Sequence, residues 1–104
     1  MVRSRLALAL LLGSASLVSM AQDAASVRAL AATCASCHGT NGRSATSEVA
    51  SLAGLPKEHV AAAMRAFRDG SRPATVMHQL AKGYTDREIE LLAAFFAAQE
   101  RRAP

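Results

Sequence analysis

One pentapeptide, Cys34-Ala35-Ser36-Cys37-His38, carries the residues whose types and spacing could do chemistry. Its pattern, C-x-x-C-H, is typical of the site at which a c-type haem is attached. Two thiols three positions apart lie near one face of a helical turn, where each can form a thioether to one haem vinyl group. The following histidine can then serve as the proximal ligand of the iron. We therefore predict one covalent haem c, bound through Cys34 and Cys37, with His38 as an axial ligand.

Three other uses of paired cysteines compete with this interpretation. A redox dithiol of the thioredoxin type follows a strand, and no strand-like run precedes Cys34. A structural zinc site requires four ligands, and the two remaining histidines, His59 and His78, form no second compact pair. A disulfide between the two cysteines would close a very small loop and would leave His38 unexplained. Covalent haem accounts for all three residues of the motif.

A second axial ligand for the iron must come from elsewhere in the chain. Beyond the first 21 residues there are two methionines, Met64 and Met77. Met64 falls on a periodic apolar helix face, which indicates core packing. Met77 follows a proline-containing loop, from which its sulfur can approach the iron on the side opposite His38, so we predict Met77 as the second axial ligand. His78 is the rival, but adjacent residues on a helical turn point in different directions, and a solvated His78 is the more ordinary interpretation.

The elements that must position these residues are helices. Strand-like alternation is absent from the sequence after residue 21, whereas apolar residues recur at i, i+3, i+4 and i+7. The two clearest faces are Val27, Leu30, Ala31 and Cys34 in one segment and Ile89, Leu92, Ala93 and Phe96 in another. The first face predicts a helix that carries the cysteines to the haem. The fold class expected is all-α.

Further helix boundaries follow from the turn residues between these segments. Residues 39–55 are rich in Gly, Ser, Thr and Asn and are expected to form a loop. Pro56 opens a helix with an apolar face that includes Met64, and Gly70 is its expected stop. Residues 75–82 could form a short helix. His59 is expected at the surface, with contact to a haem propionate as the alternative.

The last helix has the best-defined ends. Thr85 and Glu88 have the spacing of a capping box at its start. Arg101 and Arg102 follow its end, where positive charge suits the helix dipole. Tyr84 is expected to pack its ring against this helix and to direct its hydroxyl to a polar partner.

The first 21 residues have the features of a secretory signal peptide. Arg3 and Arg5 form a basic n-region, and residues 6–12 are an unbroken apolar run before small residues. The run is too short to span a bilayer comfortably, and an uncleaved membrane anchor is the alternative. We expect a signal peptide at 1–21 and a monohaem domain at 22–104 that is periplasmic and not stably inserted in the membrane.

The charge of the chain does not indicate a nucleic-acid-binding protein. The full sequence has a formal net charge of +4, and loss of Arg3 and Arg5 with the signal peptide leaves +2. The remaining Arg and Lys residues are scattered, whereas a nucleic-acid footprint needs clustered positive charge. Two haem propionates would bring the total near neutrality. We expect no nucleic-acid partner.

Several segments together resemble the small class I cytochromes c of bacteria. These segments are Cys34–Gly39 with Asn41-Gly42, Ser51–Gly54, Ala66–Arg72, and Met77 through Asp86 into the last helix. Within that class the chain is most similar to the cytochrome subunit of flavocytochrome c sulfide dehydrogenase. The resemblance implies a class I cytochrome c fold, in which the N-terminal helix crosses the C-terminal helix and a single haem lies between them and the loops. It gives Cys34, Cys37, His38 and Met77 the haem-binding and axial roles.

The expected function is periplasmic one-electron transfer. The redox partner of the protein is inferred from the family resemblance. In a sulfide dehydrogenase, a separate flavoprotein subunit would oxidise sulfide and pass electrons to this haem, so the chain would do no catalysis of its own. The alternative is a diffusible carrier that serves a terminal oxidase or reductase. A haem enzyme or gas sensor is a third possibility, and it would require that Met77 does not bind the iron. A permanent subunit would expose apolar residues near the haem edge, for which Leu55, Ala74 and Val76 are candidates, whereas a carrier would show a rim of charge.

Overall fold

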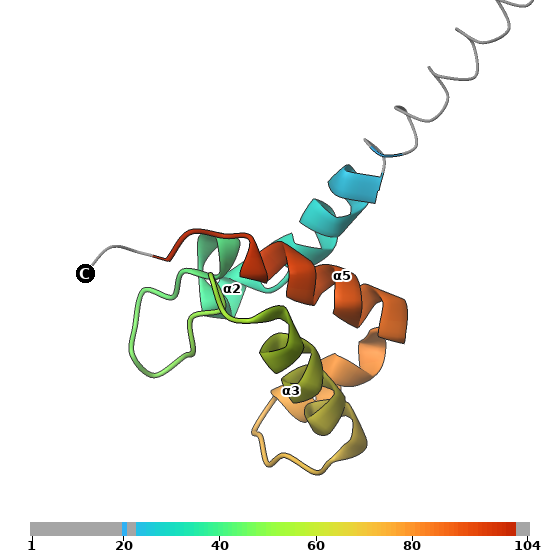
Figure 1. Cartoon of the computed structure of the whole chain (residues 1–104). Coiled ribbons are helices and arrows are strands. Elements are labelled where there is room, and N and C mark those ends of the chain that lie inside the picture. Colours follow the sequence, from blue (N-terminus) through green and yellow to red (C-terminus); the bar gives the residue numbers. More distant parts are fainter. Residues whose placement is uncertain (1–19, 21–22, 102–104) are drawn as a thin grey trace, which may run out of the picture.

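The computed structural model of this protein describes residue 20 and residues 23–101, and this part consists of helices and loops without a strand (Figure 1). The helical segments, in chain order, are residues 23–32, α2 (Ala35–His38), the 3₁₀ helix η1 (Thr40–Gly42), α3 (Lys57–Asp69), α4 (Met77–Leu80), the 3₁₀ helix η2 (Ala81–Gly83) and α5 (Asp86–Ala97). The all-α prediction is confirmed. The predicted signal peptide lies outside the described residues except for residue 20. No helix in the described part is long and apolar enough to cross a membrane.

The first helix does not run through the cysteine motif, contrary to the sequence-based expectation. Residues 33 and 34 form a turn between this helix and α2. There the backbone N–H groups of Thr33 and Cys34 donate to Leu30 and Ala31, three residues back, at 3.2 and 3.1 Å. The Thr33 hydroxyl also donates to the Leu30 carbonyl, at 2.7 Å. A threonine side chain that competes for a helix carbonyl explains why the apolar periodicity continues to Cys34 while the α-helix does not.

The helices α3 and α5 form one half of the core. Val60 and Ala61 of α3 are buried against Ile89 and Ala93 of α5, and Met64 packs on this cluster, as its helical position predicted. The faces of both helices follow the 3.6-residue repeat of their apolar residues. A proline before α3 and a left-handed glycine after it mark its ends, as expected. Packing of the two helices therefore follows from local sequence patterns.

The other half of the core joins the first helix to α5. Ala31 is buried against Leu92 and Phe96, so the N-terminal helix crosses the C-terminal helix as the family resemblance implied (Figure 1). Tyr84, just before α5, packs against both halves of the core. Its hydroxyl lies 3.1 Å from Oγ1 of Thr33, which confirms the predicted polar partner.

The start of α5 is the capping box predicted from the sequence. The Thr85 hydroxyl accepts a hydrogen bond from the backbone N–H of Glu88 at 3.2 Å, and the Glu88 carboxylate accepts one from the backbone N–H of Thr85 at 2.8 Å. The two contacts satisfy N–H groups that have no partner within the helix. This fixes where α5 begins, immediately after η2.

Ion pairs tie the outer surfaces of α3 and α5 together. Arg65 lies 2.6 Å from Glu90, and Lys57 lies 3.0 Å from the same carboxylate. Arg68 lies 2.6 Å from Asp86. The hydrogen bond from Arg68 lowers the pKa of Asp86, and those from Arg65 and then Lys57 lower the pKa of Glu90. All of these carboxylates are ionised at neutral pH, so the pairs are present under ordinary conditions.

Arg101 follows the end of α5, as expected, and its side chain hydrogen-bonds to a loop carbonyl rather than to the last turn of the helix. The helix ends at Ala97, and Arg101 instead reaches a loop far away in the sequence. Its Nε and Nη2 both donate to the Gly54 carbonyl, at 3.2 and 2.9 Å. Arg102 lies outside the described residues. Arg101 therefore follows the end of α5 by four residues, and its side chain is bonded to a loop carbonyl.

Candidate functional site

The short helix α2 brings together three of the four residues predicted to bind the cofactor. Cys34 is its N-cap residue, and Cys37 and His38 lie in its single turn. The backbone N–H groups of Cys37 and His38 both donate to the Cys34 carbonyl, at 3.3 and 2.9 Å. None of the residues of α2 is buried, so the motif is held by its backbone hydrogen bonds rather than by packing of its own side chains.

Both thiols are free, and they differ in their surroundings. Cys37 is exposed, whereas Cys34 is half-buried and packs against the core half that includes Ala31 and Leu92. Burial raises the pKa of the Cys34 thiol, an effect that the Thr33 hydroxyl partly opposes. Cys34 is therefore a thiol, not a thiolate, at neutral pH. A disulfide between the two cysteines is not formed in this structure.

The His38 ring is fixed by one short hydrogen bond. Its Nδ1 lies 2.6 Å from the backbone carbonyl oxygen of Ala50. A carbonyl only accepts hydrogen bonds, so Nδ1 must carry a proton, and in the neutral imidazole Nε2 then keeps its lone pair. This is the arrangement found around metal-binding histidines, where the second ring nitrogen is bonded to a carbonyl or carboxylate. The ring is therefore oriented and in the tautomer that a metal requires at Nε2.

A tight turn after the motif places the Ala50 carbonyl next to His38. Gly39 and Gly42 have positive φ angles of 80° and 78°. The Gly42 carbonyl accepts from the backbone N–H groups of Leu52 and Ala53, at 2.7 and 3.1 Å, and so anchors the loop two residues beyond Ala50. A Cβ at Gly42 would lie 2.8 Å from the Phe96 ring and 2.9 Å from the Ala53 nitrogen. Glycine is thus required here for both its conformation and its small size.

Met77 lies on a different part of the fold from the cysteine motif. It is the first residue of α4, which packs on α3 and η2, whereas α2 packs on η1. Met77 itself is half-buried, and α4 has no fully buried residue. The flanking side chains of Val76 and Leu80 are 55% and 50% exposed. Met77 is therefore surrounded by apolar surface and is held on a helix separate from His38.

The structure decides the interpretation of both remaining histidines. His59 is exposed on α3, which confirms the surface interpretation. His78 is half-buried rather than fully solvated. Its Nδ1 is buried and has no hydrogen-bond partner among the described residues, which corrects the solvated interpretation for this atom. The neighbouring Val76 and Leu80 are exposed.

One residue of the site, Ala50, could not be identified from the sequence. It acts through its backbone carbonyl, so its side chain carries no signal of the role. The sequence did indicate a loop over residues 39–55, but this pattern does not reveal which carbonyl faces His38.

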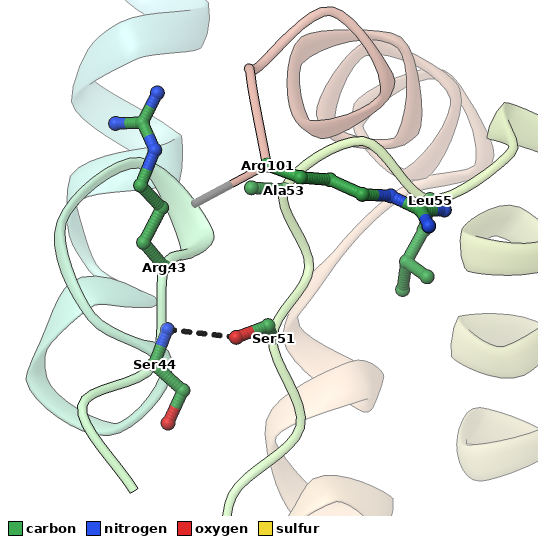
Figure 2. A pocket seen from close by; sticks show the side chains of 6 residues that line it. All are labelled: Arg43, Ser44, Ser51, Ala53, Leu55 and Arg101. Carbon is green, nitrogen blue, oxygen red and sulfur yellow. Dashed lines mark hydrogen bonds between the residues drawn. The ribbon is translucent and has the colours of Figure 1, made fainter. Parts of the chain in front are cut away.

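Two cavities lie outside the cysteine motif and α4. One, of about 260 Å³, separates the loop after η1 from the C-terminal residues, and it is lined by Arg43, Ser44, Ser51, Ala53, Leu55 and Arg101 (Figure 2). The other, of about 580 Å³, lies between the first helix and α5. Within the described part of the chain, no group of three or more His, Cys, Asp or Glu side chains could hold a metal ion. A zinc site built from side chains alone, one of the alternatives for the motif, is not formed there.

The helical fold and the C-x-x-C-H turn define a class of small haem proteins, and comparison with known families agrees. The family model for cytochrome c matches residues 24–99, and the chain therefore belongs to the cytochrome c family. Membership implies electron transfer through a haem c. The chain is also similar to a protein from Chlorobaculum tepidum, the cytochrome subunit of sulfide dehydrogenase, with 46% identity over 48 residues. That match covers 46% of this chain and 44% of the relative, so it spans less than half of each.

The residues of this site fit a c-type haem. Cys34 and Cys37 are free thiols at the spacing of thioether attachment, and His38 has an oriented ring with an unused nitrogen. The Met77 thioether is a soft donor of a kind that haem iron accepts, and the exposed apolar side chains of Val76 and Leu80 beside it suit contact with a porphyrin. No carboxylate that would compete for the iron lies in α2 or α4.

Proposed function

We propose that this protein transfers single electrons through one haem c attached to Cys34 and Cys37, with His38 and Met77 as the axial ligands. The observation that carries the proposal is the 2.6 Å hydrogen bond between His38 Nδ1 and the Ala50 carbonyl, because it leaves Nε2 free and aimed by a fixed ring. The family membership supports the cofactor and the class of reaction. When bound, the haem supplies an iron that alternates between the ferrous and ferric states.

Each residue of the proposed site has a separate task. The two cysteines hold the cofactor to α2 and so fix it relative to His38. The Nδ1–H of His38, bonded to the Ala50 carbonyl, makes Nε2 a stronger donor. The Met77 sulfur favours a higher reduction potential than a second histidine would. With both axial positions filled, no substrate can bind the metal, so the chain relays electrons rather than catalysing a reaction.

The proposed electron donor is a flavoprotein that oxidises sulfide. The support is the relative from Chlorobaculum tepidum, which is itself a cytochrome subunit of sulfide dehydrogenase. The predicted apolar edge offers partial support. Ala74 and Val76 are exposed, but Leu55 packs on the core half formed by α3 and α5 and is not part of that edge. A diffusible carrier between other redox proteins is the alternative.

The proposed compartment is the periplasm, with residues 1–21 removed as a signal peptide and residues 22–104 forming the monohaem domain. The basic and apolar composition of the first 12 residues supports export, as does the haem motif. N-terminal sequencing of the haem-loaded protein tests this proposal. A mature chain that begins near Gln22 agrees with it, and an intact N-terminus in the haem-loaded protein contradicts it.

The partner is tested by purifying the tagged, haem-loaded protein from its native host and adding sulfide while recording the haem spectrum. Co-elution of a flavin-containing chain with prompt haem reduction supports the role of a sulfide dehydrogenase subunit. A cytochrome that elutes alone and stays oxidised with sulfide contradicts that role and supports the diffusible carrier. The double variant Cys34→Ala/Cys37→Ala is the matched control, since it should carry no covalent haem and should show no such spectral change.

A further inference from the structure

The C-terminal residues after α5 contact both ends of the loop that carries Ala50. At one end, Nε of Arg43 donates to the Glu100 carbonyl at 2.8 Å. At the other end, Arg101 donates from Nε and Nη2 to the Gly54 carbonyl, and the Gly54 N–H donates to the Phe96 carbonyl at 2.8 Å. Residues 43–54 are thus tied at both ends to residues 96–101. The Ala50 carbonyl that orients His38 lies between the two ties.

These hydrogen bonds act beside the packing of Leu52 on the core half that includes Phe96 and the burial of Ala53, which hold the end of the loop nearest Gly54. The cavity of about 260 Å³ lies between the two segments, so few side chains fill the space there. Figure 2 shows Arg101 extended past Ala53 toward Leu55, with Arg43 on the segment across the cavity. Across the opening, the Ser44 N–H donates to the Ser51 hydroxyl at 3.0 Å (Figure 2). Beside the cavity, where fewer side chains are in contact, the polar contacts at the two ends of the loop carry more of its restraint.

We propose that Arg101 and Arg43 are positioning residues for His38: they fix the 43–54 loop and, through it, the Ala50 carbonyl. The guanidinium of Arg101 suits this role because two N–H groups converge on one carbonyl, which restrains direction as well as distance. Loss of either tie lets the loop move and lengthens the hydrogen bond to Nδ1. Since a weaker bond at Nδ1 makes Nε2 a poorer donor, the ferric iron loses stabilisation and the reduction potential rises. This last step rests on the proposed function of His38 as an axial ligand.

The test uses the intact haem-loaded protein in its ferrous form and measures how fast the His38 Nδ1 proton exchanges with solvent by NMR. We expect exchange about tenfold faster in Arg101→Gln than in the wild type, because a net loss of one or two hydrogen bonds is of the order of the 1.4 kcal/mol that corresponds to tenfold. Arg43→Gln should act in the same direction from the other end of the loop. Arg101→Lys keeps the charge and a donor and should lie between the wild type and Arg101→Gln.

Arg87→Gln is the matched control, because Arg87 is an exposed arginine on α5 and its replacement removes the same charge. It should leave the exchange rate and the reduction potential unchanged. Backbone amides of Ile89 and Ala93 report on the core, and their protection should persist in Arg101→Gln, which separates a local effect from general loss of stability. An unchanged His38 exchange rate in both Arg101→Gln and Arg43→Gln overturns the proposal.

The same spectra distinguish failure of this proposal from failure of the proposed function. If His38 is an axial ligand, the haem ring current displaces its ring protons in the wild type, whatever the variants do. A wild-type His38 with undisplaced protons refutes the ligand role. Faster exchange in Arg101→Gln without any change in potential refutes the link from the loop to the iron.

Discussion

The hydroxyl of Tyr84 lies 3.1 Å from Oγ1 of Thr33, which joins the residue before the first cysteine of the motif to the segment before α5. The Thr33 hydroxyl donates its one proton to the Leu30 carbonyl, so the Tyr84 hydroxyl is the donor of the second bond. The Tyr84 ring packs on both halves of the core at the same time. One side chain thus connects the start of the haem motif to all three long helices.

Replacing Tyr84 with phenylalanine should lower the free energy of unfolding by about 1 kcal/mol, since it removes one hydrogen bond and keeps the ring. Denaturant unfolding of the haem-loaded protein measures the change. In a double-mutant cycle with Thr33→Ala, the loss in free energy of unfolding for the double variant should be smaller than the sum of the losses for the two single variants. Full additivity would show that the bond contributes nothing.

Replacing Met77 with alanine should open one axial position of the iron. We expect the reduced variant to bind carbon monoxide promptly and the oxidised variant to lose the weak far-red band of sulfur ligation, because no other sulfur lies on α4. Met64→Leu is the control, since Met64 packs on the core, and it should change neither property. Retention of the band in Met77→Ala would assign the ligand to another residue.

Replacing Gly42 with alanine should destabilise the protein by about 3 kcal/mol, because a Cβ there combines an unfavourable positive φ with overlap of the Phe96 ring and the Ala53 nitrogen. Gly70→Ala is matched in φ, at 83°, but its Cβ meets nothing within 4 Å, so it should cost about 1 kcal/mol. Unfolding of both variants in denaturant provides the comparison. An equal loss of unfolding free energy in the Gly42→Ala and Gly70→Ala variants would mean that close packing at Gly42 is unimportant.

Stability should fall in acid because the pKa values of Asp86 and Glu90 are lowered by their arginine and lysine partners. A carboxyl with a lowered pKa in the folded state stabilises the fold above its usual pKa, about 3.9 for Asp and 4.3 for Glu, and this stabilisation is lost as the pH falls through the folded-state value. Denaturant unfolding at a series of pH values should show this decline below about pH 4. In Asp86→Asn, the free energy of unfolding should fall less steeply with decreasing pH. Glu58→Gln, at an exposed site on α3, should leave this pH dependence unchanged.

The chain without haem should be largely unfolded. Among the described residues, five of the nine buried apolar side chains are alanines, and neither α2 nor α4 buries any residue. A domain of this size with so little apolar burial needs its cofactor for stability. Circular dichroism of Cys34→Ala/Cys37→Ala, prepared without haem, should show little helix. A strongly helical, cooperatively unfolding apo chain would refute this expectation.

Much of the fold could be predicted from the sequence because its determinants are local. The apolar faces of α3 and α5, the capping box at Thr85, and the stop at Gly70 depend on residues within one or two turns of each other. The cysteine motif could be recognised for the same reason. The sequence does not reveal contacts between distant segments, such as Arg101 with Gly54 or His38 with Ala50, because a backbone carbonyl is the same chemical group at every position.

Two errors have specific physical causes. The apolar periodicity continued to Cys34 while the helix ended at the Thr33 turn, since a side-chain hydroxyl took a helix carbonyl. The Nδ1 of His78 is buried in the folded protein, and hydropathy does not report which ring atom the fold covers. Both errors concern a polar side chain whose partner, or lack of one, depends on the three-dimensional arrangement.

Because α5 contributes to both halves of the core, the order of synthesis matters for this chain. The ribosome makes the cysteine motif well before it makes Ile89, Leu92 and Phe96, the residues against which α3 and the first helix pack. Neither half of the core can form until those residues are available. Cys34 and Cys37 are therefore accessible to covalent modification while the chain is still unfolded, and the last helix completes the fold around a motif that is already in place.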